Sequence, residues 1–228
     1  MNPQRLARIA GLFYLLVAVF SVLATYSTGQ AYEPGDAAAT RRNVEAHAGL
    51  VRAGFVADLV QATCFLFVAM TLYVLFKHVS KAAVRALMMF VAISVTIMCL
   101  NAVYQLVALV VATGTSYTGS LSGAESDALV LLMFDLHRYG FLVAQIFFGL
   151  WLLPFGYLVY RSGMFPRVLG ILLVLGCAGY LIDTFARFLA PDLGAALSPF
   201  VLVPPAVAEV AMLLWLLVKG AEPQVVPA

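Results

Sequence analysis

The sequence predicts an all-α integral membrane protein, a six-transmembrane-helix bundle, from its composition, its long apolar segments and the distribution of its cations. Of the 228 residues, 64% are hydrophobic and only 11% are charged, and the mean hydropathy is +1.01. Soluble domains contain roughly 25% charged residues and about half apolar ones. A water-soluble fold has too few interior positions for this many apolar side chains, so most of the chain must lie in lipid.

Six apolar segments reach the roughly 20 residues that a helix needs to cross a bilayer. They cover residues 9–28, 50–76, 84–112, 129–160, 168–189 and 200–218. We expect one transmembrane domain over residues 1–228, with an outer loop at 29–48 and a short disordered tail at 220–228. The first segment is long for a cleaved signal peptide and is expected to stay as an anchor. Good helix formers follow Asp36 in the outer loop, which predicts a short helix capped by that residue.

The lysines and arginines of the short loops predict the orientation in the membrane. If the six segments alternate in direction, eight cations fall on one side: Arg5, Arg8, Lys77, Lys81, Arg85, Arg161, Arg167 and Lys219. The opposite loops hold Arg41 and Arg42, with Arg52 and Arg187 near helix ends. The excess of cations on one side predicts that both termini face the cytoplasm, which places the protein in a cell (plasma) membrane.

Two segments resemble each other. The sequence RAGFVADLVQATCFLFVAMTLYVLFKHV begins at Arg52, and RYGFLVAQIFFGLWLLPFGYLVYRSG begins at Arg138. Both start with Arg-x-Gly-Phe, continue through about 20 apolar residues and end in a basic, tyrosine-containing stretch, and each is followed by a returning helix. The pattern predicts a parallel repeat of two helical hairpins, related by an axis along the membrane normal.

Polar side chains interrupt the apolar segments at similar depth, in the outer half of the membrane. Charged residues inside a membrane span are costly and normally face the protein interior or a water-filled cavity. We therefore predict a buried polar layer, and its members are the candidate residues for binding a ligand or protons. They are Asp58, Asn101, Gln105, Asp135, His137, Arg138, Asp183, Arg187 and Glu209.

Helical spacing predicts pairs within this layer. Asp135 and Arg138 are three residues apart, and Asp183 and Arg187 are four apart, so each pair shares a helix face. We expect Arg138 to point inward, bonded to Asp135 and to a group from another helix. His137 lies two residues from Asp135, about 200° around the helix, and does not share the face of that carboxylate.

The charges of the layer do not balance. Three arginines meet four carboxylates, so one acid must be protonated, pair with a protonated histidine or neutralise a bound cation. Glu209 is the candidate, because no basic residue lies three or four positions away. It also follows Pro204 and Pro205, which should break a helix or begin one. A carboxylate just inside an interrupted helix is typical of transporter sites.

Other site classes have little support. Cys64, Cys99 and Cys177 form no CxxC or zinc pattern, so we expect buried thiols and no disulfide framework. One membrane histidine gives no metal-ligand spacing, and no GxSxG, HExxH or glycine-rich phosphate loop occurs. The net charge of +2 leaves no footprint for nucleic acid. We expect no metal, no cofactor and no nucleic-acid partner.

One block resembles a known family. Residues 136–183, LHRYGFLVAQIFFGLWLLPFGYLVYRSGMFPRVLGILLVLGCAGYLID, are similar to the central block of a bacterial membrane family of unknown activity, domain of unknown function 4386. The N-terminal ARIAGLFYLL and the later AEVAMLLWLLVKG also resemble the ends of that family. The resemblance implies a bacterial multi-pass membrane protein and implies no particular activity.

Three functions stay open. The leading hypothesis is a membrane protein of unknown activity that binds or translocates a small ligand or protons at the polar layer. The first alternative is an intramembrane enzyme for a lipid or lipophilic substrate, with His137 as general base assisted by Asp135 or Asp183. The second is a structural or accessory subunit without chemistry. The bilayer is the expected surrounding, a small molecule or lipid the expected ligand, and a homo-oligomer is compatible with the sequence.

Overall fold

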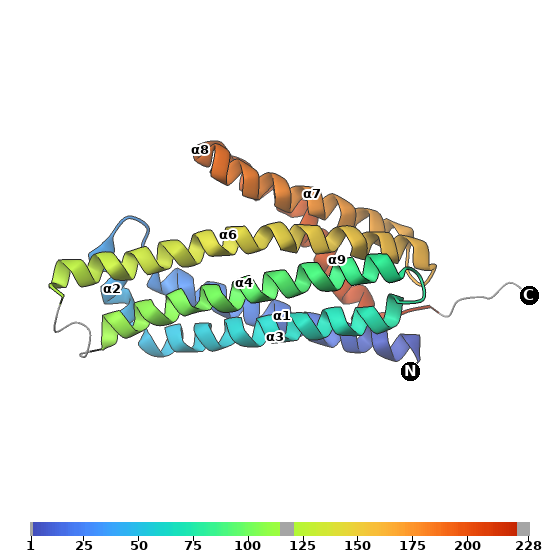
Figure 1. Ribbon diagram of the computed structural model, residues 1–228, viewed down its shortest axis with the longest axis horizontal. Coiled ribbons are helices and arrows are strands. Elements are labelled where there is room, and N and C mark those ends of the chain that lie inside the picture. The colour runs from blue at the N-terminus through green and yellow to red at the C-terminus, as the bar shows by residue number, and fades with distance from the viewer. Residues whose placement is uncertain (1, 115–120, 223–228) are drawn as a thin grey trace, which may run out of the picture. The chain divides into compact units, whose positions relative to one another are not determined.

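A computed structural model describes residues 2–114 and 121–222, and these residues form helices and connecting turns without a strand. The helices are labelled in Figure 1. They are α1 (Pro3–Ala31), α2 (Ala37–Ala46), α3 (Ala48–Phe76), α4 (Lys81–Thr113), α6 (Gly123–Ser162), α7 (Arg167–Leu189), α8 (Pro191–Val201) and α9 (Val203–Val218). The all-α prediction is confirmed. Most of the predicted tail, residues 223–228, lies outside the described residues.

Six helical spans within the described ranges are long and apolar enough to cross a membrane, as the sequence predicted. Five are single helices, and the sixth, Pro191–Val218, consists of α8 and α9 together. The longest, α6, has 40 residues. At 1.5 Å per residue this helix is about 60 Å long, roughly twice the hydrocarbon thickness, so it extends beyond the lipid or tilts. The orientation of the spans stays a prediction.

The sixth span is interrupted at Leu202, as the two prolines indicated. Helix α8 ends at Val201, and α9 begins at Val203 with Pro204 and Pro205 in its first turn. Proline has no N–H and its ring clashes with the carbonyl four residues earlier, so it is most favourable in the first turn of a helix. The two prolines therefore explain why this span is discontinuous.

The short helix of the outer loop also forms where the sequence placed it. Asp36 caps α2, and its side-chain oxygen accepts a hydrogen bond from the backbone N–H of Ala39 at 2.8 Å. Arg41, on the same helix, pairs with Glu45 at 2.8 Å and with Asp127 of α6 at 3.3 Å. The loop is thus ordered by a cap and by ion pairs outside the membrane spans.

The described chain packs as two compact units, and the division falls within α1, α3, α4 and α6. Unit 1 comprises residues 1–15, 64–95 and 142–228, and unit 2 comprises residues 16–63 and 96–141. Each unit has its own core and its own polar side chains, and each is described by itself below. The expectation of one transmembrane domain stays a prediction.

Unit 1 has an aromatic core around Trp151. This side chain is stacked on Phe155 with ring centres 5.1 Å apart, and Phe65 and Tyr14 meet it edge-on at 5.0 and 5.8 Å. Such offset and edge-to-face arrangements are the favourable geometries for aromatic pairs. Helix α7 packs against both α8 and α9 in the same unit. The core therefore fixes α1, α3 and α6 around one buried indole.

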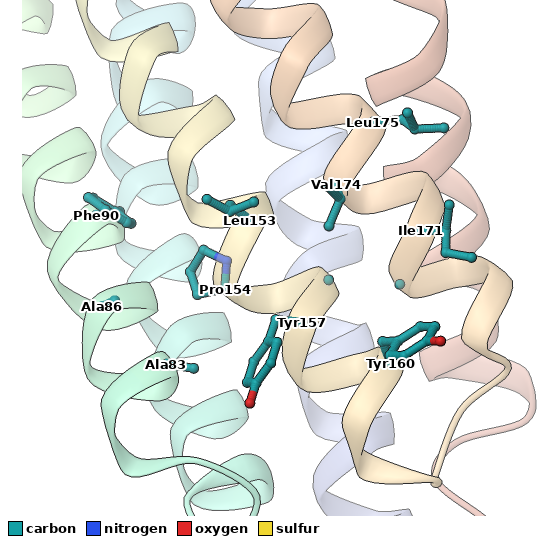
Figure 2. A pocket seen from close by; sticks show the side chains of 12 residues that line it. Ala83, Ala86, Phe90, Leu153, Pro154, Tyr157, Tyr160, Ile171, Val174 and Leu175 are labelled. Atoms are coloured by element: carbon teal, nitrogen blue, oxygen red, sulfur yellow. The ribbon is translucent and has the colours of Figure 1, made fainter.

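Glycines allow two helices of unit 1 to approach closely. A Cβ atom on Gly156 of α6 would lie 2.5 Å from the carbonyl oxygen of Gly170, and one on Gly170 of α7 would lie 2.6 Å from that of Gly156. Small residues at helix crossings are the usual way for membrane helices to gain van der Waals contact. Beside this crossing an apolar groove of about 600 Å³ opens between α4, α6 and α7 (Figure 2).

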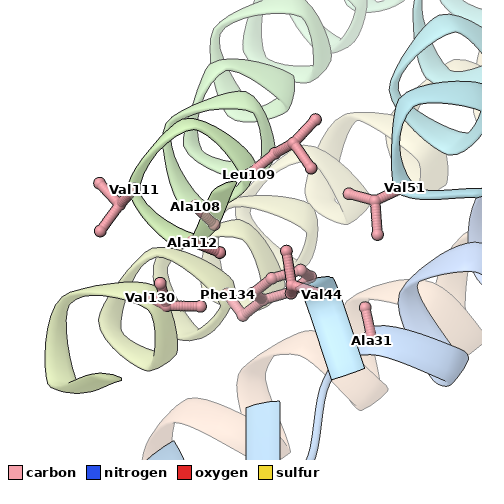
Figure 3. Packing of buried hydrophobic residues seen from close by; sticks show 9 residues of the cluster. All are labelled: Ala31, Val44, Val51, Ala108, Leu109, Val111, Ala112, Val130 and Phe134. Carbon is pink, nitrogen blue, oxygen red and sulfur yellow. The ribbon is translucent and has the colours of Figure 1, made fainter. Parts of the chain in front are cut away.

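Unit 2 has an aliphatic core. Nine buried residues from α1, α2, α3, α4 and α6 form it (Figure 3). Phe134 is its one large aromatic, and its ring stacks on Tyr32 at 5.8 Å. Val44 brings α2 into the cluster, so the short helix contributes apolar contact as well as charge. The loop that contains α2 is therefore part of the packed unit.

The glycine crossing gives the first prediction. Replacing Gly156 by Ala should lower the free energy of unfolding by about 1–3 kcal/mol, because the new methyl group overlaps a backbone carbonyl that cannot move alone. Gly123→Ala is the control on the same helix, because nothing lies within 4 Å of its Cβ position. Thermal melting in detergent measures both changes. Equal melting temperatures for the two variants would contradict the close crossing.

Candidate functional site

A buried carboxylate of unit 1 is held by two tyrosines from other helices. Tyr14 of α1 donates its hydroxyl to Oε2 of Glu209 at 2.5 Å, and Tyr180 of α7 donates to Oε1 at 2.6 Å. Glu209 lies on α9, one turn after Pro205. The site exists because the helix restarts at Leu202 and then carries its acid toward α1 and α7.

Hydrogen bonds rather than a cation stabilise the charge of Glu209. Three salt bridges occur in the part of the chain that the structure describes, and none of them includes this residue. Tyr14 is 5% exposed and its ring meets the face of Trp151, so the surroundings are apolar. Hydrogen bonds to an ionised group are stronger than neutral ones, and two of them partly replace the hydration that the carboxylate loses.

A second carboxylate of unit 1 forms the predicted ion pair. Asp183 lies 3.2 Å from Arg187 one turn along α7, which confirms the expected pairing. Asp183 also accepts a hydrogen bond from Gln145 at 2.7 Å, and the same amide group donates to Thr184 at 3.1 Å. Arg187 in turn donates to Ser198 of α8 at 2.7 Å. This chain of bonds connects α6, α7 and α8.

The two carboxylates belong to one group of residues, which we call the Glu209 cluster. Its residues on α7 follow helical spacing along one face, so Tyr180 and Asp183 lie a turn apart. Gln145 joins them, because its amide group donates both to the Tyr180 carbonyl at 3.4 Å and to Asp183. The members are Tyr14, Gln145, Tyr180, Asp183, Thr184, Arg187, Ser198 and Glu209.

Unit 2 holds a different polar group, centred on Asn101 and His137. The Asn101 amide nitrogen donates to the backbone carbonyl of His137 at 2.8 Å, and Nδ1 of His137 lies 3.2 Å from the backbone carbonyl of Asn101. A carbonyl oxygen only accepts, so this second bond requires the proton on Nδ1 and leaves Nε2 as the acceptor. The two residues bond reciprocally and join α4 to α6.

The glycines of the two Arg-x-Gly-Phe segments are both positions of close approach in unit 2. A Cβ on Gly140 would lie 2.0 Å from Oδ1 of Asn101, and one on Gly54 would lie 2.3 Å from the hydroxyl oxygen of Ser27. Only glycine leaves room for these polar side chains from a neighbouring helix. The repeated sequence thus has a shared structural consequence, since each glycine admits a polar group.

Arg138 differs from its prediction. Asp135 accepts a hydrogen bond from the hydroxyl of Tyr32 at 2.5 Å, and none of the described salt bridges contains Arg138. The Arg138 side chain is exposed, with its guanidinium 5.0 Å from the ring centre of Tyr139 and donating to the Tyr139 hydroxyl at 3.3 Å. The expected inward pair was wrong. A long cation lowers its free energy by reaching outward, and a phenol takes its place beside the carboxylate.

Three further acceptors of unit 2 are buried without a hydrogen-bond partner in the described residues: Oδ2 of Asp58, Oδ1 of Asn101 and Oε1 of Gln105. The amide nitrogen of Gln105, by contrast, donates to the Thr28 hydroxyl at 3.3 Å. His137 has partners only from Asn101 among the interactions described here, and no carboxylate is among them. The candidate residues therefore divide between two units, and Arg52 and Arg138 are exposed.

Sequence reasoning missed the tyrosines. Tyr14, Tyr32 and Tyr180 supply the donors to Glu209 and Asp135, and each is counted as apolar or amphipathic in a hydropathy reading. A spacing signal exists only for Tyr180, which is three residues before Asp183 on the same helix face. Ser198 and Thr184 were missed for the same reason, since a small hydroxyl in an apolar segment normally bonds within its own helix.

The described residues contain no group of three or more His, Cys, Asp or Glu side chains that could hold a metal ion. The chemistry available is hydrogen bonding and proton or cation binding by carboxylates. Six apolar spans with buried carboxylates, amides and hydroxyls define a multi-pass helical membrane protein.

The comparisons with known proteins give the family. A family model described as Domain of unknown function (DUF4386) matches residues 9–220, and the chain belongs to this family. An uncharacterized protein of Archaeoglobus fulgidus is 36% identical over 78 residues. That match covers 34% of this chain and 44% of the other protein, so it spans less than half of either. No solved structure matches the chain.

Tyr32 gives the second prediction. Tyr32→Phe should cost about 1.5–3 kcal/mol at neutral pH, because the Asp135 carboxylate loses a donor. Burial and the hydrogen bond to Asp135 raise the pKa of Tyr32 to about 12, from an ordinary value of 10.0. The folded protein thus holds this proton more tightly than the unfolded chain does. The stabilisation is complete below pH 10 and is lost as the pH rises toward 12.

Thermal melting of wild type and Tyr32→Phe from pH 8 to pH 12 measures this effect. The difference in melting temperature should be constant up to about pH 10 and shrink above it. Tyr26→Phe is the matched control, because Tyr26 is 58% exposed and lies in the last turns of α1, shortly before Tyr32. A difference that is independent of pH would contradict the bond between Tyr32 and Asp135.

Arg138 gives the third prediction. Because its side chain is exposed and bonded only to its neighbour Tyr139 in the described structure, Arg138→Leu should change the free energy of unfolding by less than about 0.5 kcal/mol. Arg187→Leu is the comparison and should cost about 3–5 kcal/mol, since it leaves the buried Asp183 unpaired. Melting at pH 5 and pH 8 tests both. If Arg138→Leu lowered the melting temperature more at pH 8 than at pH 5, the result would support the inward pairing with Asp135.

Proposed function

We propose that this protein binds or translocates a small ligand or protons within the plasma membrane, and that Glu209 is the group that gains and loses the charge. The observation that carries the proposal is the carboxylate of Glu209, which lies within a membrane span and is held by Tyr14 and Tyr180. Ionisable groups at such positions normally mark ligand, ion or proton pathways.

The hydrogen bonds at Glu209 provide a mechanism. As a carboxylate, the group accepts from both phenols. Once it carries a proton, one of its oxygens becomes a hydroxyl that can donate and the other accepts less strongly, so the bonds to Tyr14 and Tyr180 weaken or one of them reverses. Because these tyrosines belong to α1 and α7, uptake of a proton or of a cation changes the contacts of α9 with two other helices.

The interrupted span supports the same proposal. Glu209 follows the break at Leu202, and residues of α7 pack tightly against that break. A Cβ on Gly179 would lie 2.3 Å from the Val201 carbonyl oxygen, and one on Gly176 would lie 3.0 Å from Cα of Pro205. Discontinuous helices that place charged groups at the point of interruption are characteristic of transporter binding sites.

A cationic ligand suits the surroundings as well as a proton does. The carboxylate supplies the negative charge, and the rings of Tyr14, Tyr180 and Trp151 supply aromatic surfaces in the same unit. Aromatic faces next to a carboxylate attract ammonium groups through cation–π and ionic interactions. The class of ligand that this charge favours is a small monovalent cation.

The enzymatic alternative has less support. It requires a carboxylate next to His137, whereas the partner of that ring in the described structure is Asn101. A general base usually needs an orienting group, and an amide and a carbonyl orient the ring without supplying a negative charge. The accessory-subunit alternative predicts a purely structural role for Glu209, which the following experiment separates.

The fourth prediction concerns the protonation of Glu209. Infrared difference spectroscopy of the protein in nanodiscs between acidic and neutral pH should show the C=O stretch of a protonated carboxyl that is lost in Glu209→Gln. The band should shift in Tyr14→Phe and Tyr180→Phe, because each variant removes a hydrogen bond to the group.

Asp183→Asn and Asp135→Asn are the matched controls, and the band should persist in both. Glu209→Gln should also keep the fold, because its amide can accept from one tyrosine and donate to the other. Mass spectrometry of the gently purified wild type and Glu209→Gln then compares bound small molecules. A band that survives Glu209→Gln, or a Glu209→Gln protein that no longer folds, would support the structural role instead.

A further inference from the structure

The groove of unit 1 is apolar and open toward the surroundings of the protein. Its twelve lining residues come from α4, α6 and α7 (Figure 2). Leu153, Tyr157 and Tyr160 of α6 and Ile171 of α7 are all exposed, with fractions from 43% to 50%. A volume of about 600 Å³ is within the range of small-molecule sites. In a membrane, an apolar groove that faces lipid is filled by acyl chains.

The groove forms because several of the residues that line it are glycine or alanine. Gly156 and Gly170 bring α6 and α7 into direct contact, so no large side chain fills the space above their crossing. Ala83 and Ala86 present only methyl groups from α4. The rings of Tyr157 and Tyr160 then form part of the wall, and they are labelled in Figure 2. The groove is thus a consequence of small residues on three helices.

Three cations lie close in sequence to lining residues at one end of the groove. Lys81 and Arg85 lie in the first turns of α4, next to Ala83 and Ala86 in sequence. Arg161 follows Tyr160 at the end of α6. All three side chains are exposed.

A fourth cation contacts the groove wall directly. Arg167 begins α7, and its guanidinium lies 5.4 Å from the ring centre of Tyr160, which lines the groove. Segments 77–86 and 157–175 contain no Asp or Glu. Glu222 is the acidic residue that the described chain brings to this end, through a backbone bond from its N–H to the Met164 carbonyl at 3.1 Å. The positive charge at this end therefore exceeds the negative charge by several units.

We infer that the groove binds an anionic phospholipid, with one acyl chain along the apolar wall and the phosphate among Lys81, Arg85, Arg161 and Arg167. Basic residues between membrane helices attract acidic headgroups, and arginine binds phosphate oxygens through two parallel hydrogen bonds. The positive-inside rule assigns this lipid to the cytoplasmic leaflet. The inference does not rest on Glu209, because that residue does not line the groove.

The headgroup decides which lipid binds. Phosphatidylcholine offers the same acyl chains, but its ammonium group balances the phosphate and is repelled by four cations. Phosphatidylglycerol has a net negative charge and lacks that repulsion. Each Lys or Arg near an acidic membrane surface strengthens binding by about fivefold. The protein should therefore select phosphatidylglycerol over phosphatidylcholine of identical chains.

Native mass spectrometry of the full chain, titrated with each of the two lipids, tests the inference and gives the fifth prediction. Ala86→Trp should fill the groove and reduce phosphatidylglycerol binding at least fivefold. Arg161→Gln/Arg167→Gln should reduce it by about 25-fold, at two cations and about fivefold each. Met89→Trp is the control for bulk, since Met89 is on the same helix, 63% exposed and outside the groove.

Arg5→Gln/Arg8→Gln is the control for charge, because these exposed arginines belong to the same unit and to α1, which does not line the groove. Both controls should bind phosphatidylglycerol as the wild type does. Equal binding of the two lipids, or equal losses in test and control variants, would overturn the inference. Melting temperatures measured without added lipid verify that each variant is folded, and Ala86→Phe replaces Ala86→Trp if the larger ring unfolds the protein.

Discussion

The need to satisfy polar groups inside lipid governs this structure. No water is available in the hydrocarbon, so a carboxylate, amide or hydroxyl on a span is costly unless it finds a partner within the protein. Glu209 finds two tyrosines, Asp135 finds Tyr32, and Asp183 finds an arginine together with an amide. Apart from Arg187, these partners come from other parts of the chain, so the polar side chains specify which segments meet and in which register.

Tyrosine hydroxyls rather than arginines are the partners of most of these carboxylates. An arginine beside a buried carboxylate neutralises it and removes its ability to bind anything else, as for Asp183 and Arg187. A tyrosine hydroxyl stabilises the charge without cancelling it, and at neutral pH it is itself uncharged. The carboxylate then keeps a net charge that a proton or a cation can neutralise. The difference between the two kinds of partner separates the Asp183–Arg187 ion pair from Glu209, the proposed binding group, within one cluster.

Much of the fold was predictable because lipid imposes simple rules on a sequence. The six spans follow from apolar length, the cap at Asp36 from local hydrogen bonding, and the break at Leu202 from two prolines. The pair of Asp183 and Arg187 was predictable because both residues lie on one helix, where spacing alone fixes the geometry.

The contacts between helices were not predictable in the same way. Helical spacing states which residues share a face, but it does not state which other helix covers that face. Tyr14 and Glu209 are 195 positions apart, and nothing in the apolar sequence around Tyr14 marks it as a donor. The predicted pairing of Arg138 was wrong for a related reason. Its spacing from Asp135 permitted a pair, but Tyr32, just after the end of α1, donates to the carboxylate and the arginine remains exposed.

The two prolines at the start of α9 have a consequence for the backbone itself. A helix normally begins with four N–H groups that lack a partner in the helix, and inside lipid each would be costly. At α9 two of these groups do not exist, because Pro204 and Pro205 have no N–H, and a third, on Leu202, bonds to the Ser198 carbonyl at 3.2 Å. The chain can therefore interrupt a span and begin a new helix inside the membrane while leaving at most one backbone donor to be solvated. A pair of prolines is thus a means of turning a helix in lipid with little loss of hydrogen bonding.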